Sequence, residues 1–501
     1  MPPFNSFTAT DLHKALPDVQ STMYLEGLAQ PVVVRRDEWG IPHIAAGNAA
    51  DLFFAQGFVT AQDRLWHMDY DRHRALGRWA EWVGADGVGE DLLMRAAGMG
   101  RTARLDYDMS GADARQMMDA YSAGVNSFIE TTKSLPIEYT ILGTRPEPWE
   151  AWHCPTVYKM RNTLLGTYEG KLFRSRMVVA GAAASLARLT KGYPVGHLLT
   201  VPPGAEFHGD RLDGLDELER LLGDVEELGG GATDAELWQA AAIDVDAGSN
   251  AWAISGDYTE SGLPLVAGDS HRGLDTPSVY YQIHLSCPEF SVIGSSVPGM
   301  AGVLHFCHND HVAWGMTFGA ADTQDLYLER FRDAPASGRQ YEFAGGWREA
   351  EVLDEEIFVR DGETLETEVT VTHHGPVIAG EPAAGWGVTI SDPGLIDGSS
   401  WPDAVLNAMR CRSVAELHGA FGKWTDRVNN YAVADVSGTF GYLHEGRIPV
   451  RDDANCWRAI AGWRGDSEWR GYIPHDDLPK AIDPAAGYAV TCNQRVVDES
   501  Y

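Results

Sequence analysis

The chain has 501 residues, of which 44% are hydrophobic and 10% aromatic, so it can build a large packed core and is not globally disordered. Its 39 basic and 72 acidic residues give a formal net charge of -33, which argues against nucleic acid and anionic membrane surfaces as partners. No run of about 18 apolar residues occurs, so no membrane-spanning helix is expected.

The N-terminal residues 1–20 contain no basic segment followed by an apolar one, so no signal peptide is expected. This favours a cytoplasmic location, with a periplasmic or secreted protein as the alternative. The six cysteines have long, irregular spacings, and none forms a C-x-x-C pair. We expect buried free thiols, or disulfide pairing if the protein is exported. The cysteines are Cys154, Cys287, Cys307, Cys411, Cys456 and Cys492.

The first two hundred residues are predicted to be mainly helical. Residues 31–46 are typical of two short strands joined by a turn at Trp39–Gly40. Asn48 is then a plausible N-cap, because apolar residues recur at helical spacing after it. Those residues are Phe54, Phe58, Leu65 and Met68, and helical patterns continue over 115–133 and 154–189.

Residues 203–248 differ from both flanks. They are acidic, contain three consecutive glycines at 229–231, and carry leucines that predict one amphipathic helix before those glycines. On composition alone this segment is an inter-domain linker. From Ser249 onward the pattern changes to short β-branched or aromatic runs that end at Gly, Pro or Asp. The expected strands lie within 250–255, 263–268, 278–286, 290–295, 303–317, 350–379, 386–391 and 430–443, with one helix at 402–422.

Several motifs occur in a specific order on the two sides of the Gly248–Ser249 bond. Before it stand RDEWGIPHI and FAQGFVTAQDRLWHMDYDRHRALGRWAEWVG. After it stand GSNAW, GDSH, CHNDHVAWGMTFGAADTQDLY, NNYAVADVSGTFGYLHEGRIP and GYAVTCNQ. Together, over most of the chain, they resemble the penicillin acylase family of N-terminal nucleophile hydrolases. That family includes penicillin, cephalosporin and acyl-homoserine lactone acylases.

The resemblance implies an α+β fold, the four-layer αββα sandwich of these hydrolases, with a helical N-terminal chain wrapped on it. The sandwich would be incomplete here, because family precursors continue well beyond the position of Tyr501. Residues 1–202 would form an α-chain, 203–248 a spacer, and 249–501 a β-chain that lacks the family's C-terminal part. The precursor would cut itself before Ser249 and become an α/β heterodimer.

Self-cleavage would explain how Ser249 can act without a histidine base. A free α-amine has a pKa of about 7.7–8.0, so an appreciable minority is unprotonated at neutral pH and can accept the hydroxyl proton. Ser249 would then attack an amide carbonyl and form an acyl-enzyme. Gly248, which lacks a Cβ, suits the strained backbone that an N→O acyl shift needs. The structural alternative for Ser249 is an ordinary serine at a strand edge.

Three further residues are assigned to the site by the resemblance. The backbone N–H of Phe318 and the side-chain amide of Asn493 would stabilise the oxyanion. His271, 22 residues after Ser249, would orient or polarise the serine hydroxyl and amine. Judged from the residues alone, Asn493 is equally typical of a turn and His271 of an exposed loop.

A calcium site is also implied by the resemblance. Asp322, the backbone carbonyl of Gln324, and Asp325 would bind Ca2+, with Glu169 and the carbonyl of Trp457 as less secure ligands. Such a structural ion would clamp the two chains together. The alternative is a pair of solvated carboxylates without an ion.

Two other motifs carry little functional weight. His305, His308 and His311 are spaced like zinc ligands, but residues three apart in a strand point to different faces. The segment GSSVPG at 294–299 lacks the G-x-S-x-G pattern of a nucleophile elbow.

The sequence therefore predicts an amidohydrolase that acts on a small linear amide with an apolar acyl group. A β-lactam antibiotic side chain or an N-acyl-homoserine lactone would fit this description. Two alternatives stay open at this point. One is a conventional Ser-His-Asp hydrolase that uses another serine. The other is an uncleaved family fragment that is inert or only binds acyl groups.

Overall fold

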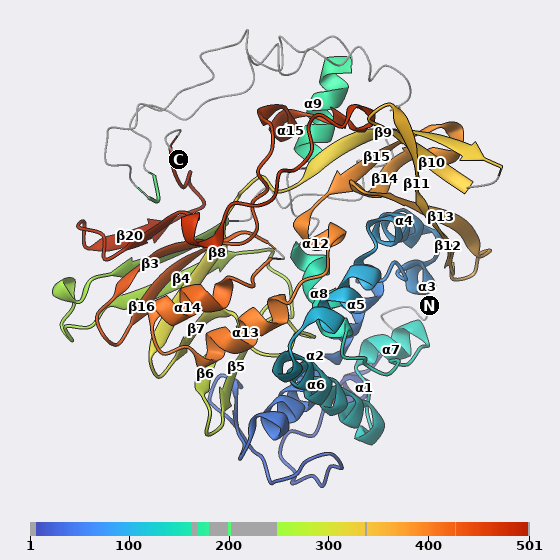
Figure 1. Cartoon of the computed structure of the whole chain (residues 1–501). Coiled ribbons are helices and arrows are strands. Elements are labelled where there is room, and N and C mark those ends of the chain that lie inside the picture. The colour runs from blue at the N-terminus through green and yellow to red at the C-terminus, as the bar shows by residue number, and fades with distance from the viewer. Residues whose placement is uncertain are drawn as a thin grey trace.

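The computed structural model describes residues 7–162, 168–179, 199–201, 248–335, 338–425 and 427–498. It contains both helices and sheets, with the longest helices before residue 180 and most strands after residue 248, which is consistent with the α+β class (Figure 1). Apart from Gly248, the predicted spacer and its amphipathic helix lie outside the described residues.

Helices dominate the N-terminal region, as predicted. Asn48 caps the longest of them, because its Oδ1 accepts the Asp51 N–H at 2.8 Å. Two helices of this region touch through glycines: a Cβ on Gly57 would overlap the Tyr121 backbone, and one on Gly124 would overlap the Phe54 backbone. The helices are α1 Ala9–Lys14, α2 Ala49–Ala75, α3 Ala80–Val83, α4 Val88–Ala97, α5 Met99–Met109, α6 Ala112–Thr131, α7 Ile137–Leu142, α8 His153–Asn162 and α9 Tyr168–Val179.

A nine-stranded sheet is the framework of the molecule. Its order is β1-β2-β5-β6-β7-β8-β16-β17-β19. The N-terminal region supplies its first two strands, and β2 pairs in parallel with β5, with His43 opposite His284. The strands are β1 Val33–Arg36, β2 Pro42–Ala45, β5 Tyr281–Ser286, β6 Ser291–Ser296, β7 His305–Asn309, β8 Val312–Phe318, β16 Asn429–Asp435, β17 Phe440–Glu445 and β19 Lys480–Ile482.

A three-stranded sheet, β20-β3-β4, packs face to face with part of the nine-stranded sheet. Its strands are β20 Tyr488–Thr491, β3 Gly248–Ile254 and β4 Leu265–His271. Alternate residues of β3 point inward, so Ala251 and Ala253 pack against a small apolar cluster of Ala432, Ala434 and Phe440. Ser249 has the same parity and is buried on the same face.

An eight-stranded sheet forms a second body of strands (Figure 1). Helices α4 and α9 pack on it through Leu93, Met94 and Leu172, which join a core with Leu326 and Val388. Its order is β11-β10-β9-β15-β14-β13-β12, with β18 beside β9. The strands are β9 Asp325–Ala334, β10 Gly338–Phe343, β11 Gly346–Glu349, β12 Glu351–Ile357, β13 Leu365–Thr372, β14 Gly375–Glu381, β15 Trp386–Ser391 and β18 Ile460–Ala461.

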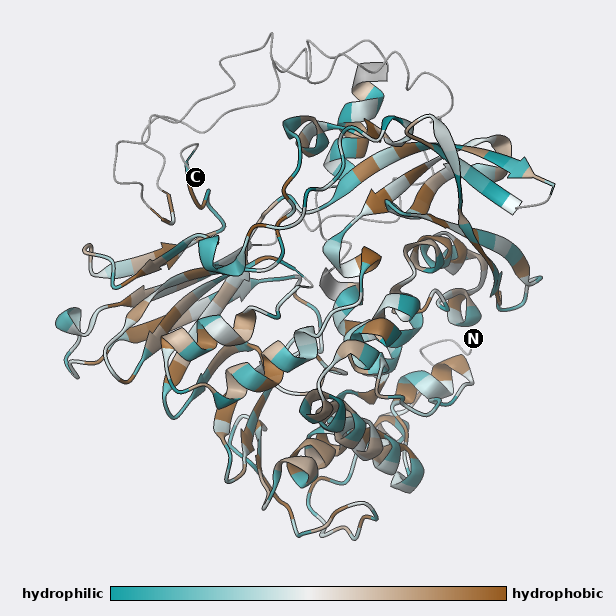
Figure 2. Ribbon diagram, in the orientation of Figure 1, coloured by the Kyte–Doolittle hydropathy of each residue, from teal (hydrophilic) through white to brown (hydrophobic). Residues whose placement is uncertain are grey.

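The helix expected at 402–422 is two helices, α13 Trp401–Arg410 and α14 Val414–Phe421. The break falls where Cys411 adopts an extended conformation and the Ser413 Oγ caps the second helix by accepting the Glu416 N–H. Both helices share the largest core with α2, α6 and the nine-stranded sheet. Figure 2 shows the alternation of hydrophobic and hydrophilic residues along the strands that makes this packing possible. Two short helices, α12 Pro393–Ile396 and α15 Asp453–Trp457, complete the fold.

The six cysteines all lie in the described part of the chain, and each is a free thiol there. Cys154, Cys307 and Cys411 are buried, and burial raises the pKa of each thiol. Among the described residues no helix is long and apolar enough to cross a membrane.

Candidate active site

Ser249 lies where the three-stranded sheet meets the nine-stranded sheet. It is the second residue of β3, and it is buried on the face turned toward β8 and β16. Across the ladder it pairs with Ser270 of β4. The fold therefore presents the Ser249 hydroxyl to the space between two sheets.

Two expected oxyanion donors do lie at this hydroxyl. The Phe318 N–H, at the end of β8, points at the Ser249 Oγ over 3.4 Å. The Asn493 Nδ2 lies 3.5 Å from the same oxygen. Both distances are at the long end for hydrogen bonds, as is common before a catalytic site binds its substrate. The structure thus brings together three residues that are up to 244 positions apart.

Asn493 also holds the backbone nitrogen of the serine. Its Oδ1 accepts the Ser249 N–H at 2.7 Å, while its Nδ2 donates to the Phe318 carbonyl at 2.8 Å. Asn493 adopts a left-handed conformation with φ of 64°, which asparagine tolerates better than most residues. This turn after β20 directs the side-chain amide back into the site. Asn493 can therefore be a turn residue and also be positioned as an oxyanion donor.

His271 lies beside Gly248 rather than against the serine hydroxyl. It is directly opposite Gly248 in the β3–β4 ladder, and its side chain is 45% exposed. Its Nε2 lies 3.3 Å from the Asn250 Nδ2 and 3.4 Å from the Asp269 Oδ2. Within the described residues it makes no hydrogen bond to Ser249. The expected direct contact with the hydroxyl is thus not seen in the uncleaved chain.

A buried side-chain amide lies beside the two expected oxyanion donors. No motif in the sequence predicted a role for it. Asn430, at the start of β16, is fully buried. Its Nδ2 lies 3.1 Å from each of the Thr317 Oγ1, the Phe318 carbonyl and the Thr491 Oγ1. The two threonine hydroxyls are 3.0 Å apart. This network ties the end of β8 to the end of β20 and so fixes both donors relative to Ser249.

The same asparagine is held from its other side by β17. The Tyr442 hydroxyl donates to the Asn430 Oδ1 at 2.5 Å, and the His444 Nδ1 lies 2.7 Å from that oxygen. Burial lowers the pKa of His444 to about 4, so the ring is neutral at pH 7 and donates one N–H. In the sequence, the only signal for this network is that polar residues occur within strands that should be buried.

A small cavity of about 60 Å³ opens beside Ser249. Burial and the nearby Arg272 lower the pKa of His305 to about 3, and the guanidinium of Arg427 lies 3.5 Å above the Phe318 ring. The walls are formed by Gly248, Ser249, Ser270, Arg272, Val279, Tyr280, Val297, His305, Met316, Thr317, Phe318, Arg427 and Asn429.

The oxygens expected to bind calcium surround an amino group. The Lys171 Nζ lies 2.9 Å from the Asp322 Oδ1, 2.7 Å from the Asp325 Oδ1 and 2.5 Å from the Gln324 carbonyl. Lys171 is on α9 and its side chain is fully buried. Arg451 contacts the other oxygens of both carboxylates at 3.0 and 2.9 Å. Two positive and two negative side chains therefore neutralise one another.

The two other expected calcium ligands, the Trp457 carbonyl and Glu169, have different surroundings. The Trp457 carbonyl accepts the Arg174 Nε–H at 2.6 Å. Glu169 is half-buried, and this burial raises the pKa of its carboxyl. A calcium ion needs six to eight oxygens with no ammonium among them, so the donor set as folded does not fit calcium. As folded, the oxygens of Asp322 and Asp325 form a buried ion-pair cluster with Lys171 and Arg451.

Comparisons with known proteins show which family the chain belongs to. Residues 31–501 match the family model described as penicillin amidase. The chain is 40% identical over 494 residues to the penicillin acylase 2 proenzyme of Pseudomonas sp. (strain SE83), covering 98% of this chain and 62% of that protein. It is 31% identical over 493 residues to an acyl-homoserine lactone acylase, QuiP, of Pseudomonas fluorescens (strain Pf0-1), covering 97% and 59%.

A solved thermostable penicillin G acylase from Alcaligenes faecalis aligns at 28% identity with a TM-score of 0.44, over 50% of this chain and 45% of that one. The chain thus spans about three fifths of the length of the two curated relatives. The family model nevertheless matches nearly the whole chain, from residue 31 to its last residue. This chain belongs to the penicillin amidase family.

Proposed function

We propose that this protein is an N-terminal nucleophile amidohydrolase that uses Ser249 to cleave a small linear amide with an apolar acyl group. The observation that carries the proposal is the position of Asn493, which reaches both the nitrogen and the hydroxyl of Ser249. The Phe318 N–H points at the same hydroxyl. The similarity to proteins named penicillin acylase and acyl-homoserine lactone acylase supports this class of substrate.

The first step of the proposal is self-cleavage. The Ser249 Oγ attacks the Gly248 carbonyl carbon, its proton passes to the departing nitrogen, and the peptide C–N bond is replaced by an ester. Water then hydrolyses the ester and leaves the Gly248 carboxylate and the free Ser249 amine. Gly248 leaves room for this rearrangement, because a Cβ there would lie only 3.2 Å from the His271 Nδ1.

Turnover follows with the same groups. The neutral α-amine of Ser249 takes the proton of Oγ as the oxygen attacks the substrate carbonyl. The Phe318 N–H and the Asn493 Nδ2–H stabilise the oxyanion, and collapse of the intermediate sends the proton to the leaving amine. Water attacks the resulting ester by the same route and releases the acid.

The cavity supports an acyl group with an apolar stem. Val279, Val297 and Met316 give it apolar walls, and Arg272 and Arg427 also line it. These two cations could in addition accept an acyl chain whose far end is polar or anionic. A panel of anilides with plain aliphatic acyl chains and with chains ending in a carboxylate separates the two possibilities.

We further propose that the fold is the four-layer sandwich of this family and that cleavage yields an α/β heterodimer. Helices, the nine-stranded sheet and the three-stranded sheet supply three successive layers. The outer face of the three-stranded sheet exposes Trp252, Leu265, Tyr488 and Val490. An apolar sheet face of this kind supports a further covering layer.

Intact mass measurement with N-terminal sequencing tests the proposal. The wild type should give two chains, the second beginning at Ser249, while Ser249→Ala should stay whole and inactive. Ser291→Ala is the matched control and should be processed and active. A folded wild type that remains one chain, or activity in Ser249→Ala, would contradict the mechanism.

The control also tests the conventional serine hydrolase. The Ser291 Oγ lies 3.0 Å from the His284 Nε2, as a nucleophile and its base would. The other ring nitrogen of His284 faces His43 at 3.0 Å, however, and not a carboxylate. That arrangement lacks the acid that would stabilise a protonated imidazole. Loss of activity in Ser291→Ala alone would favour this rival.

A further inference from the structure

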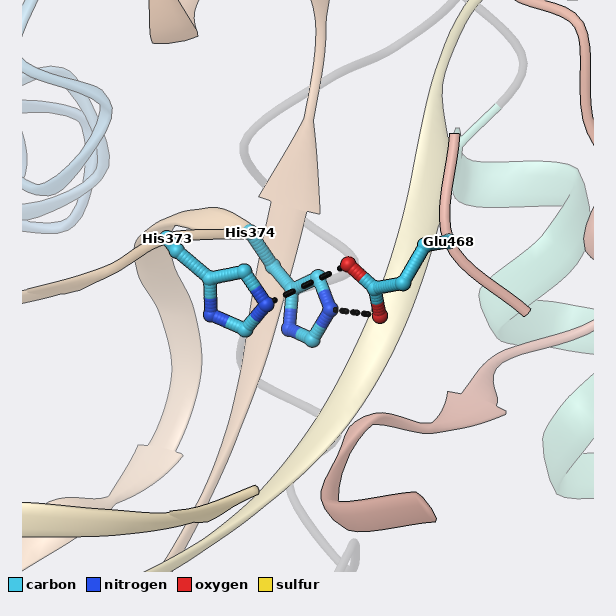
Figure 3. Close-up of side chains that lie close together, drawn as sticks. All are labelled: His373, His374 and Glu468. Atoms are coloured by element: carbon cyan, nitrogen blue, oxygen red, sulfur yellow. Dashed lines mark hydrogen bonds and ion pairs between the residues drawn. The ribbon is translucent and has the colours of Figure 1, made fainter. Parts of the chain in front are cut away.

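Two adjacent histidines and one glutamate converge on the eight-stranded sheet (Figure 3). His373 and His374 lie between β13 and β14, and both rings point their Nε2 atoms toward Glu468. The His374 Nε2 is 2.8 Å from the Glu468 Oε1, and the His373 Nε2 is 3.2 Å from the Oε2. We call these three residues the HHE cluster.

The buried histidine of the HHE cluster is fixed from behind. Its Nδ1 lies 2.6 Å from the Oε1 of Glu329, a residue of β9 that is 1% exposed. The Thr372 hydroxyl donates to the same carboxylate oxygen at 3.2 Å, and the Tyr327 ring stacks on the His374 ring at 3.8 Å. A carboxylate on the far nitrogen of a histidine is the usual outer partner of a metal ligand, because it sets the tautomer and the ring orientation.

Glu468 is positioned by its two neighbours in the chain. The Ser467 carbonyl accepts the Tyr327 hydroxyl at 3.0 Å, and the Trp469 Nε1–H donates to the Asp325 Oδ2 at 2.6 Å. The carboxylate therefore does not depend on the histidines alone for its place. All three ligand groups are held before any ion arrives, which reduces the entropy lost on binding.

Charge and access also favour a cation. Two carboxylates, those of Glu329 and Glu468, contact the His374 ring. The Glu329 Oε2 is buried without a hydrogen-bond partner among the residues described. His373 and Glu468 are about one third exposed, so one side of the cluster is open to solvent. A tetrahedral ion with bonds of about 2.0–2.1 Å keeps its ligands about 3.3 Å apart. The two nitrogen-to-oxygen separations of 2.8 and 3.2 Å are close to that value.

We propose that the HHE cluster binds a zinc-like divalent transition metal through the His373 Nε2, the His374 Nε2 and the Glu468 carboxylate, with one position left to water. Two imidazoles and one carboxylate suit Zn²⁺ or Co²⁺ and not calcium, which prefers oxygen ligands only. The cluster belongs to the eight-stranded sheet, whereas Ser249 belongs to the three-stranded sheet. The ion would pin the segment around Glu468 to β13 and β14, so its role is structural.

Cobalt titration of the full chain, stripped with EDTA and dialysed, tests the proposal. The Ser249→Ala variant serves as the background, so the result is independent of processing and catalysis. One equivalent of Co²⁺ should give visible absorption bands of a four-coordinate site, which Zn²⁺ then abolishes. His373→Ala and Glu468→Gln should each weaken binding by about tenfold or more. His13→Ala, an exposed histidine on α1, is the matched control and should bind as the parent does.

Circular dichroism and thermal unfolding check that each variant is folded. Binding of one equivalent that both cluster variants weaken and the control does not would establish the site. Absence of stoichiometric binding by the folded parent would overturn the proposal and leave an ion-pair cluster. Binding unaffected by both variants would overturn it equally, because the ion would then lie elsewhere.

Discussion

The side-chain amide of Asn493 spans Ser249 from its backbone nitrogen to its hydroxyl, with the Oδ1 2.7 Å from the nitrogen and the Nδ2 3.5 Å from the Oγ. In the uncleaved chain the Ser249 N–H can only donate, because a peptide nitrogen has no available lone pair. After cleavage a neutral amine would still donate one hydrogen to the Oδ1. Its lone pair would then be directed toward the hydroxyl proton that it must accept.

Asn493→Ala should lower turnover strongly. Removing one oxyanion donor typically costs about 10²–10³-fold in kcat. The effect should appear in kcat rather than in KM, because the donor acts when negative charge develops. Steady-state kinetics on the processed protein measure it, with Asn407→Ala, an exposed amide on α13, as the matched control. A variant of Asn493 with unchanged kcat would remove this residue from the mechanism.

Gly248→Ala should slow self-cleavage. The added Cβ would stand 3.2 Å from the His271 Nδ1, so the imidazole must shift by a few tenths of an ångström, whereas the Asn493 Oδ1 at 3.8 Å is an ordinary contact. Time courses of chain scission, followed by intact mass, measure the effect. In the double variant with His271→Ala the added methyl has room, and the rate should equal that of His271→Ala alone. A persistent difference between those two would mean that crowding at His271 is not the cause.

Lys171→Met should destabilise the protein by about 3–5 kcal/mol, because it leaves the two carboxylates of the buried cluster with one cation, Arg451, instead of two. Lys423→Met, which removes an exposed lysine 3.6 Å from Asp403, should cost about 1 kcal/mol or less. Urea denaturation measures both. The calcium chelator EGTA should not change the stability of the wild type. Stability that falls with EGTA and returns with calcium would restore the calcium site.

Stability should decrease as the pH falls below about 6.5, partly because of His444. Burial lowers its folded pKa to about 4 from its ordinary value of about 6.5, so between these values the unfolded chain binds the proton and the folded chain does not. The contribution is therefore present above pH 6.5 and is lost as the pH falls toward 4, by about 3 kcal/mol. Denaturation at pH 7 and pH 4.5 measures it. His444→Gln should show a smaller difference between the two pH values.

The strands after Ser249 were predictable because they are short β-branched or aromatic runs that end at Gly, Pro or Asp. The strand expected at 386–391 matches β15, and those expected at 278–286 and 290–295 match β5 and β6 within a few residues. The helix expected at 402–422 was wrong in one respect, since Ser413 begins a second helix there. A serine followed three residues later by glutamate is a start signal that apolar periodicity alone conceals.

The candidate catalytic groups were predictable only through the family resemblance. Ser249, Phe318 and Asn493 converge because sheet pairing brings β3, β8 and β20 together, and no local pattern encodes such distant pairing. The ion pairs that Lys171 makes with the expected calcium ligands could not be predicted in this way. Lys171 follows Glu169 by two positions on a helix, so it is about 200° away around the axis and meets β9 where the glutamate does not. Which of the two reaches the carboxylates depends on how α9 packs.

The parallel pairing of β2 with β5 has a consequence for the proposed two-chain protein. Residues 42–45 and 281–286 lie on opposite sides of the Gly248–Ser249 bond, yet they share one continuous ladder of hydrogen bonds. Cutting the bond would turn an intramolecular sheet into an intermolecular one without moving a strand. Unfolding would then release two molecules instead of one, so the melting temperature should rise with protein concentration. Refolding from denaturant should likewise become a second-order process that dilution slows.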